Sequence, residues 1–287
     1  GQADNDHFGF SVSGAGDLNN DGYADVVVGA PGFDGAGTDR GKIYFYLGST
    51  IGITSTLSWE KDGTSDSAML GYSVAGAADI NNDTYSDVVA GAPYDDTAGT
   101  DRGSASIFFG SPSGISNASH TQYGESNNDN FGWSVSGAGD PNNDGYSDII
   151  VGAPNHNSNT GKIYVFLGSQ NSGLSTSANW PKVGEAVNDN FGWSVSGAGD
   201  VDGNGIEDVV VGAPNFDGTG GSFSNSGRIY VYLGSGSGLS TITPSWTALA
   251  DRIGDQFGYS VSGTGDINAD GYADIVVGAP NQDIDHG

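Results

Sequence analysis

One nine-residue pattern occurs five times in this chain, at residues 17–25, 79–87, 140–148, 200–208 and 266–274. Each copy has oxygen-bearing side chains at its first, third, fifth and ninth positions, and the carbonyl of the seventh residue is free to point inward. A hard cation such as calcium prefers about 6–8 oxygen ligands, and a tight loop with ligands at alternate positions supplies them. Five copies in register therefore predict metal binding, with up to five calcium ions.

The candidate ligands are the side chains at positions 1, 3, 5 and 9 and the carbonyl at position 7. They are Asp17, Asn19, Asp21, Tyr23 and Asp25; Asp79, Asn81, Asp83, Tyr85 and Asp87; Asp140, Asn142, Asp144, Tyr146 and Asp148; Asp200, Asp202, Asn204, Ile206 and Asp208; and Asp266, Asn268, Asp270, Tyr272 and Asp274.

Two copies depart from the common pattern. The second has Thr84 where the others have a Gly at position 6, and a non-Gly residue in a left-handed conformation costs roughly 1–2 kcal/mol. We therefore expect the second site to be the weakest. The fourth copy exchanges acid and amide, with Asp202 at position 3 and Asn204 at position 5, and so keeps three carboxylates. An EF-hand or dockerin loop is disfavoured, because position 12 of the first loop is Val28, within an apolar run.

The first residues of the five loops are 62, 61, 60 and 66 positions apart, which indicates a structural repeat. A short glycine-flanked segment precedes each loop and is predicted to be a strand, at 8–14, 70–76, 131–137, 191–197 and 257–263. A β-branched run that ends in Gly-Ala-Pro follows each loop, as in Val26 to Pro31, and reads as a buried second strand. The proline ends that strand because it has no N–H for the ladder.

A variable polar loop and a third strand with alternating aromatics follow, at 42–47, 104–109, 162–167 and 228–233. We interpret these aromatics as packing between sheets rather than as a sugar-binding platform. A weaker fourth strand is expected around Trp59, Tyr123, Trp180 and Trp246, and no segment predicts a helix. The repeat therefore predicts an all-β fold, a β-propeller of four-stranded antiparallel blades, over a parallel β-solenoid, whose coils are much shorter.

Charge and composition limit the function. The chain has 287 residues with 35 acidic and 8 basic side chains, a net charge of −27, which disfavours nucleic acid and anionic membranes as partners. The absence of Cys excludes disulfides and thiolate catalysis. No transmembrane run is visible, so membrane insertion is not expected. Calcium sites in this number favour an extracellular, secreted or cell-surface location.

The Phe-Gly start, the Asp-x-Asn-x-Asp-Gly-x-x-Asp loop and the Gly-Ala-Pro end resemble the FG-GAP repeat of integrin α-subunit head domains and related bacterial secreted proteins. The resemblance covers essentially the whole chain. It implies a propeller, usually of seven blades, with calcium in the hairpin between the first two strands of a blade. It also implies a ligand surface mostly on the opposite face, here loops 31–41, 93–103, 154–161 and 214–227 and the links before each Phe-Gly strand.

The repeats span about 8–69, 70–130, 131–190, 191–256 and, in part, 257–287 of a single domain or segment. The fifth contains only the first two strands. We therefore expect an open arc of blades that belongs to a longer, about seven-bladed propeller, or a half blade that a neighbouring chain completes.

No nucleophile elbow, zinc-type His pair or phosphate loop is present, and the four histidines fall at non-equivalent positions, so an enzyme is not expected. The favoured function is an extracellular adhesion or protein-interaction module with structural calcium, whose ligand is a protein or glycan. The alternatives are a self-associating structural subunit of a surface layer or fibre and a carbohydrate-binding module attached to an enzyme.

Overall fold

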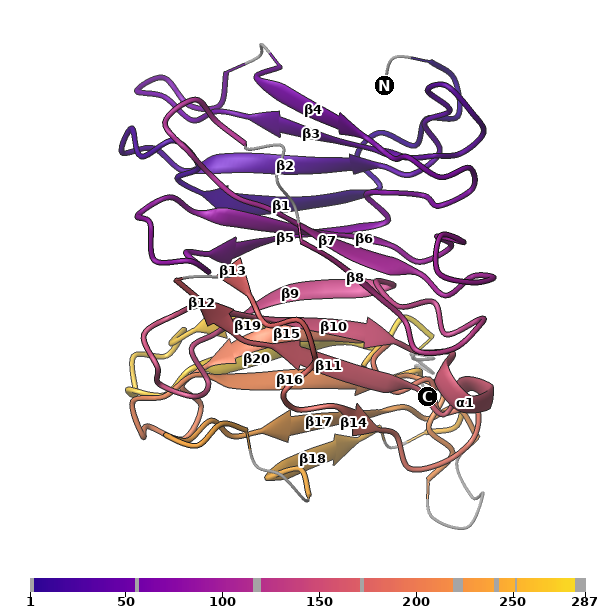
Figure 1. The fold of residues 1–287 in the computed structure, drawn as a ribbon. Helices are drawn as coiled ribbons and strands as arrows, with labels where there is room; N and C mark the ends of the chain where they lie inside the picture. The colour runs from indigo at the N-terminus through magenta and orange to yellow at the C-terminus, as the bar shows by residue number, and fades with distance from the viewer. Residues whose placement is uncertain are drawn as a thin grey trace, which may run out of the picture.

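The structure is a computed structural model that describes residues 3–54, 57–115, 120–170, 173–218, 224–239, 243–250 and 252–281. Its strands form four-stranded antiparallel sheets, the blades (Figure 1). Blade 1 contains β1 (Ser11–Gly16), β2 (Asp25–Ala30), β3 (Lys42–Tyr46) and β4 (Trp59–Asp62). Blade 2 contains β5 (Ser73–Ala78), β6 (Asp87–Ala92), β7 (Ser104–Phe108) and β8 (Thr121–Tyr123).

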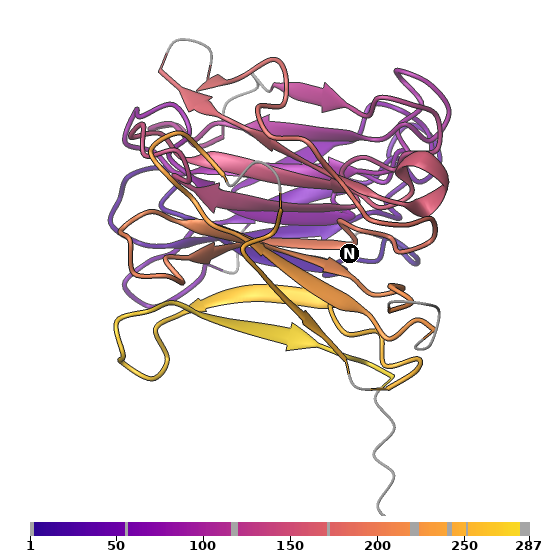
Figure 2. The same ribbon diagram turned by 90° about the horizontal axis from the view of Figure 1, so that it is seen from below.

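Blade 3 contains β9 (Ser134–Gly139), β10 (Asp148–Ala153), β11 (Lys162–Phe166) and β14 (Lys182–Val183). A small hairpin of β12 (Gly168–Ser169) and β13 (Gly173–Leu174) lies between its last two strands in sequence. Blade 4 contains β15 (Ser194–Gly199), β16 (Asp208–Ala213), β17 (Arg228–Tyr232) and β18 (Trp246–Leu249). The half blade contains β19 (Ser260–Gly265) and β20 (Asp274–Gly278), beside blade 4 (Figure 2).

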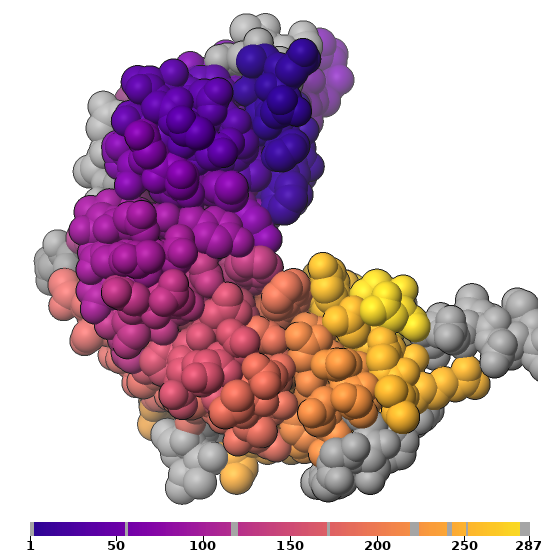
Figure 3. All heavy atoms as spheres, turned by 90° about the vertical axis from the view of Figure 1, so that its right-hand side faces the viewer, coloured from indigo at the N-terminus to yellow at the C-terminus, as the bar shows by residue number. Residues whose placement is uncertain are grey.

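The predicted all-β propeller architecture is confirmed. The innermost strands β1, β5, β9, β15 and β19 lie next to one another. Figure 3 shows the expected open arc, with a wedge-shaped gap between blade 1 (indigo) and the half blade (yellow). The number of blades in the whole protein stays a prediction.

Three details differ from the sequence-based expectations. The innermost strands begin three residues later than predicted, because the Phe-Gly pair forms a turn in which Phe10 N donates to His7 O over 3.0 Å. The fourth strand of blade 3 begins after Trp180, at Lys182. One helical turn, α1 (His156–Asn159), replaces part of an expected loop, and its Asn157 and Ser158 have left-handed dihedral angles.

The hydrophobic core lies between adjacent blades. Val27, Ile43 and Phe45 of blade 1, for example, pack in one buried cluster with Val88 and Phe108 of blade 2. Most third-strand aromatics, such as Phe45, Tyr164 and Tyr230, are buried in such clusters, as their interpretation as packing residues predicts. Within the described residues, no helix has the length and apolar character needed to cross a membrane.

The two glycines of the repeat meet where blades touch. A Cβ on Gly29, in the Gly-Ala-Pro of blade 1, would lie 2.0 Å from the carbonyl oxygen of Gly71, in the turn that opens blade 2. The same approach recurs at the next three junctions, at 1.9–2.1 Å. Any side chain would therefore force neighbouring blades apart, so both glycines are needed for close packing.

A chain of side-chain amides crosses the junctions at the Pro end of the second strands. The residue after each of three Gly-Ala-Pro motifs and the residue before each of three Phe-Gly turns take part. The bonds run from Asn155 to Asn130, Asn190 to Asn155, Asn215 to Asn190, Gln256 to Asn215 and Asn281 to Gln256, at 2.6–3.1 Å. This amide chain links blades 2, 3, 4 and the half blade.

Candidate metal centres

The five acidic loops connect the first and second strands of each blade and the half blade, so they lie at one end of the strands. In the first loop, Asp17 accepts from Asp21 N and Gly22 N through its two oxygens, over 3.0 and 2.7 Å. Asn19 Oδ1 accepts from Asp21 N at 3.1 Å, and Asp21 Oδ1 accepts from Tyr23 N at 3.0 Å. The other four loops repeat these four bonds. The backbone thus fixes the predicted ligand side chains at positions 1, 3 and 5.

The position 9 carboxylate also accepts a hydrogen bond from the turn that follows the third strand, a role that the sequence analysis missed. Asp25 is 1% exposed; its Oδ2 accepts from Leu18 N and its Oδ1 from Gly48 N, both at 2.8 Å. Asp87, Asp148 and Asp208 hold the equivalent glycines at 2.8–3.0 Å. The Gly-Ser turn after each third strand was the available signal. In the half blade, Asp274 retains the bond from Ile267 N, and the described residues provide no glycine of this kind.

Burial raises the pKa values of these position 9 carboxyls. Loss of hydration raises the pKa of Asp87 to about 7 and that of Asp208 to about 6. In each case two hydrogen bonds from backbone N–H groups lower the pKa, but they only partly offset the effect of burial. The carboxylates at positions 1 and 5 or 3 of the same loops raise these pKa values further. An ionised carboxylate is therefore costly here without a nearby positive charge.

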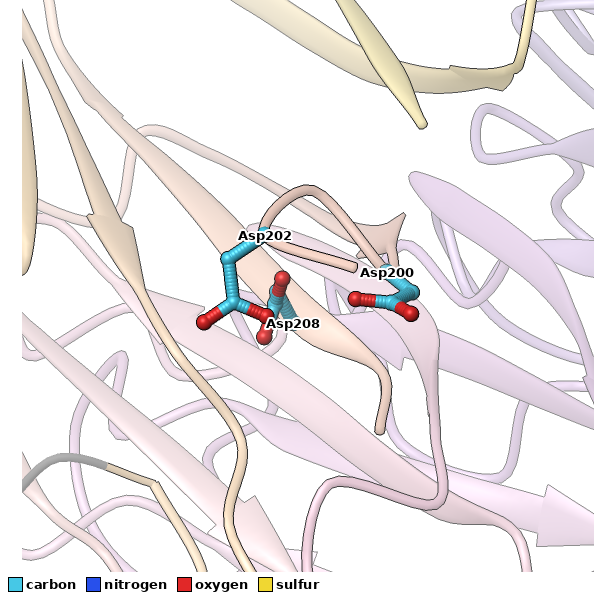
Figure 4. Close-up of side chains that lie close together, drawn as sticks. All are labelled: Asp200, Asp202 and Asp208. Carbon is cyan, nitrogen blue, oxygen red and sulfur yellow. The ribbon is translucent and has the colours of Figure 1, made fainter. Parts of the chain in front are cut away.

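The fourth loop brings three carboxylates closest together. Ligand oxygens of Asp200, Asp202 and Asp208 all lie within 4.8 Å of one another, and Figure 4 shows the three side chains around one space. No other group of three acidic or histidine side chains in the described residues is this compact. In the first loop, by contrast, Asp21 Oδ2 accepts from Asn19 Nδ2 at 3.0 Å, which holds this carboxylate against the amide.

Thr84 has the left-handed conformation that its position predicts, with φ at 78°, compared with 91° for Gly22. Its hydroxyl accepts from Asn20 Nδ2 of the neighbouring loop at 3.3 Å, a contact that the sequence does not reveal. Position 4 is left-handed in every loop, which suits Asn20 or Gly203 but strains Ala269, at φ 60°.

Neighbouring loops are hydrogen-bonded to one another. Ser86 N donates to Asp17 O at 2.9 Å, Ser147 N to Asp79 O at 3.3 Å, and Ala273 N to Asp200 O at 2.8 Å. Asp140 N donates to Glu207 Oε2 between the third and fourth loops. An ion that fixes one loop would therefore also fix the contact between two blades.

A row of aromatic rings lies at the opposite ends of the innermost strands, and the sequence analysis did not single it out. The signal was an aromatic residue two positions after each Phe-Gly or Leu-Gly start. The row contains Phe10, Tyr72, Trp133, Trp193 and Tyr259, with successive ring centroids 4.7–5.5 Å apart. The second strands run antiparallel to the innermost strands, so the loops that follow them, such as 31–41 and 93–103, lie at this same end.

The loops offer carboxylate, amide and backbone carbonyl oxygens, and a donor set of oxygens alone suits a hard divalent cation. Radial sheets with such hairpins define this protein as a β-propeller with acidic inter-strand loops. FG-GAP repeats match at residues 8–46, 70–108, 131–166, 191–232 and 257–287, so the chain belongs to the FG-GAP repeat family.

Similar proteins include integrin α chains. The chain is 33% identical to integrin alpha pat-2 of Caenorhabditis elegans over 231 residues, which are 73% of this chain and 18% of that protein. It is 37% identical to integrin alpha-5 of Xenopus laevis over 157 residues (51% and 15%), and 29% identical to integrin alpha-3 of Cricetulus griseus over 269 residues (90% and 24%). The chain thus spans a quarter or less of these relatives.

Proposed function

We propose that this chain is a calcium-binding propeller of the cell exterior that acts as an adhesion or protein-interaction module. The observation that supports it most strongly is the fivefold repetition of acidic loops with the same backbone-anchored side chains. The similarity to integrin α chains supports an adhesion function rather than an enzymatic one.

In this proposal each ion is held by the residues at positions 1, 3, 5, 7 and 9 of one loop, and its role is structural. Fifteen carboxylates occupy ligand positions in the five loops, and five calcium ions would add ten positive charges to −27, which leaves about −17. The ions would offset the repulsion among loop carboxylates and the cost of the buried position 9 charge.

Chelation tests the calcium part of the proposal. A ligand that binds only the folded state stabilises it by roughly 2.7 kcal/mol per site at a hundredfold excess over Kd. We expect excess EDTA to lower the melting temperature strongly and magnesium to restore it poorly, since magnesium prefers small octahedral sites. Calorimetry should find up to five calcium ions. An unchanged melting curve in EDTA would contradict the proposal.

The ligand surface is assigned to the end that carries the aromatic row and the variable loops. Aromatic side chains with exposed area are enriched at interfaces. The double variant Trp133→Ala/Trp193→Ala should reduce binding to immobilised protein and glycan ligands, whereas Trp246→Ala, on the outermost strand of blade 4, should not. Equal binding by both variants would place the ligand surface elsewhere.

A further inference from the structure

The junction between blades 1 and 2 lacks an aromatic pair that the other complete blades contain. In blades 1, 3 and 4, the Phe of the Phe-Gly turn packs edge-on against a Tyr of the third strand, with ring centroids 5.0–5.1 Å apart. The pairs are Phe8–Tyr44, Phe131–Tyr164 and Phe191–Tyr230. In blade 2 these two positions are Leu70 and Ser106. Two rings are thus replaced by two much smaller side chains.

The same junction also lacks the ion pair that the next two junctions contain. At the next two junctions, Lys162 Nζ lies 2.7 Å from Glu125 of blade 2, and Arg228 lies 3.0 Å from Glu185 of blade 3. Both cations also lie over the Tyr ring of their own strand. The equivalent residues between blades 1 and 2 are Ser104 and Thr64, so both charges are absent from these positions.

These smaller side chains leave a cavity of about 230 Å³. Its lining includes Thr64, Leu70, Ser104, Ser106 and Asp95. Several lining residues are exposed to solvent, among them Thr64 and Tyr123. A flexible side chain or a small molecule can therefore enter from solvent.

Two acidic residues line this space: Asp62, whose half-exposed carboxylate pairs with Lys42 at 2.9 Å, and the buried Asp95. In blades 1 and 4 the position of Asp95 is occupied by Phe33 and Phe216, whose rings contact the basic side chain. Asp95 is 7% exposed; its Oδ2 accepts from Ser104 Oγ at 2.7 Å, and its Oδ1 accepts from Thr97 N and Oγ1 at 2.9 and 2.5 Å. All three donors are neutral, whereas a buried carboxylate is normally paired with a positive charge.

We propose that this cavity binds a primary ammonium group on an aliphatic stem, with the ammonium beside Asp95. The stem would occupy the volume that the Lys stem and Tyr ring fill at the other junctions. An ammonium has three donors, and the hydroxyls of Ser104 and Ser106 add acceptors to the carboxylate. The ligand is either a lysine side chain of another protein or a free alkylamine. This proposal does not depend on the calcium sites or the aromatic row.

Calorimetry or NMR titration of the calcium-loaded chain tests the proposal with three probes: N-acetyl-lysine methylamide, pentylamine and the uncharged N-acetyl-norleucine methylamide. We expect a Kd of about 1 mM for at least one amine and binding about tenfold weaker, or weaker still, for the norleucine compound. Tighter binding of the lysine compound would indicate a protein ligand, and tighter binding of pentylamine a free amine. No saturable binding of either amine up to about 10 mM would overturn the proposal.

Variants assign the binding to this cavity. Asp95→Asn should weaken amine binding at least about tenfold, whereas Asp4→Asn, an exposed carboxylate, should not change it. Lys61 is the basic residue that lines the cavity, so Lys61→Ala should tighten binding by removing a repelling charge. Unchanged binding in Asp95→Asn would overturn the assignment.

A junction-filling variant keeps the test valid if Asp95→Asn folds poorly. The triple change Thr64→Glu, Ser104→Lys and Ser106→Tyr copies the composition of the other junctions. It should abolish amine binding without lowering the melting temperature of the calcium-loaded protein, because it fills a cavity. Amine binding that persists in a folded triple variant would also overturn the proposal.

Discussion

Pro141 leaves one carboxylate oxygen of Asp148 without a hydrogen-bond partner. In the other four loops, the residue at position 2 donates its N–H to Oδ2 of the position 9 Asp at 2.8 Å. Proline has no N–H, and Asp148 Oδ2 is buried with no partner. Burial raises the pKa of Asp148 to about 8, compared with about 7 for Asp87, which keeps both backbone bonds.

Replacing this proline with a residue that has an N–H should stabilise the protein. Pro141→Ile supplies the missing donor, and a buried hydrogen bond contributes on the order of 1 kcal/mol. We expect a higher melting temperature at pH 8 and a lower pKa of Asp148, measured by carboxyl NMR in chelator. Val201→Pro in the fourth loop is the reverse change and should have opposite effects. A Pro141→Ile variant with the same Asp148 pKa would contradict this explanation.

The raised pKa values also predict how the calcium-free protein responds to pH. Asp208, Asp87 and Asp148 have folded-state pKa values of about 6, 7 and 8, above the ordinary 3.8. Between the ordinary pKa and the raised pKa of each carboxyl, the folded state holds a proton that the unfolded state releases, so stability falls as pH rises. It should be highest near pH 4 and decline through pH 8.

Denaturant unfolding in EDTA from pH 4 to pH 9 measures this dependence. Asp148→Asn removes one titrating group and should reduce the slope between pH 6 and pH 8. Saturating calcium should reverse the trend, because protons compete with the ion for the carboxylates. Stability that increases with pH in EDTA would show that these buried carboxyls do not control the pH response.

The backbone geometry of the loops was the most predictable part of the molecule, because it is determined within nine residues. The left-handed Thr84 follows from the Gly that it replaces. The bond between Asp25 and Gly48 was not predictable in the same way, since it joins residues 23 positions apart through the sheet. Side-chain spacing alone therefore identified Asp25 as a candidate ligand but not as a hydrogen-bond acceptor for the turn after the third strand.

Relieving the strain at Thr84 should strengthen the second site. Thr84→Gly removes a left-handed β-branched residue, which is worth roughly 1–2 kcal/mol, against the loss of one long hydrogen bond to Asn20. We expect higher calcium affinity at this site and a higher melting temperature in calcium. The matched reverse change, Gly22→Thr, should weaken the first site. In the unmodified chain, Asp83→Ala should then cost less stability than Asp144→Ala; equal losses would show that Thr84 does not weaken its site.

Contacts between blades were less accessible to sequence analysis than the blades themselves. The 60–66-residue period and the strand patterns predict four-stranded sheets, and the sheets are found. The Phe-Gly pair, however, forms a turn rather than strand: Gly9 has a φ of 87° and its N–H donates to Gly29 O of the same blade at 3.0 Å, and the equivalent Gly71 of blade 2 packs against Gly29 of blade 1. Such contacts depend on the approach of two backbones, which the pattern of one strand does not encode.

The amide chain at the Pro end of the second strands should contribute strongly to the stability of the contact between blades 3 and 4. Asn190 is 6% exposed; its Nδ2 donates to Asn155 Oδ1 and Pro154 O, and its Oδ1 accepts from Asn215 Nδ2 at 2.8 Å. Asn190→Ala removes these bonds and leaves the Asn215 donor and the Pro154 carbonyl without this partner. A buried polar group left unsatisfied costs about 1–3 kcal/mol, so we expect destabilisation of at least that size in calcium, measured by denaturant unfolding.

Two comparisons separate loss of the amide chain from a general effect of removing an amide. Asn127→Ala, at an exposed position, should change stability by less than about 0.5 kcal/mol. Asn190→Asp keeps the acceptor for Asn215 but loses the donor to two oxygens and places a buried charge there, so it should cost more at pH 8 than at pH 4. Because the acidic loops lie at the other end of the strands, calcium stoichiometry should be the same in all three variants. If Asn190→Ala is as stable as Asn127→Ala, the inter-blade contact depends on the apolar clusters and the glycine approach rather than on the amides.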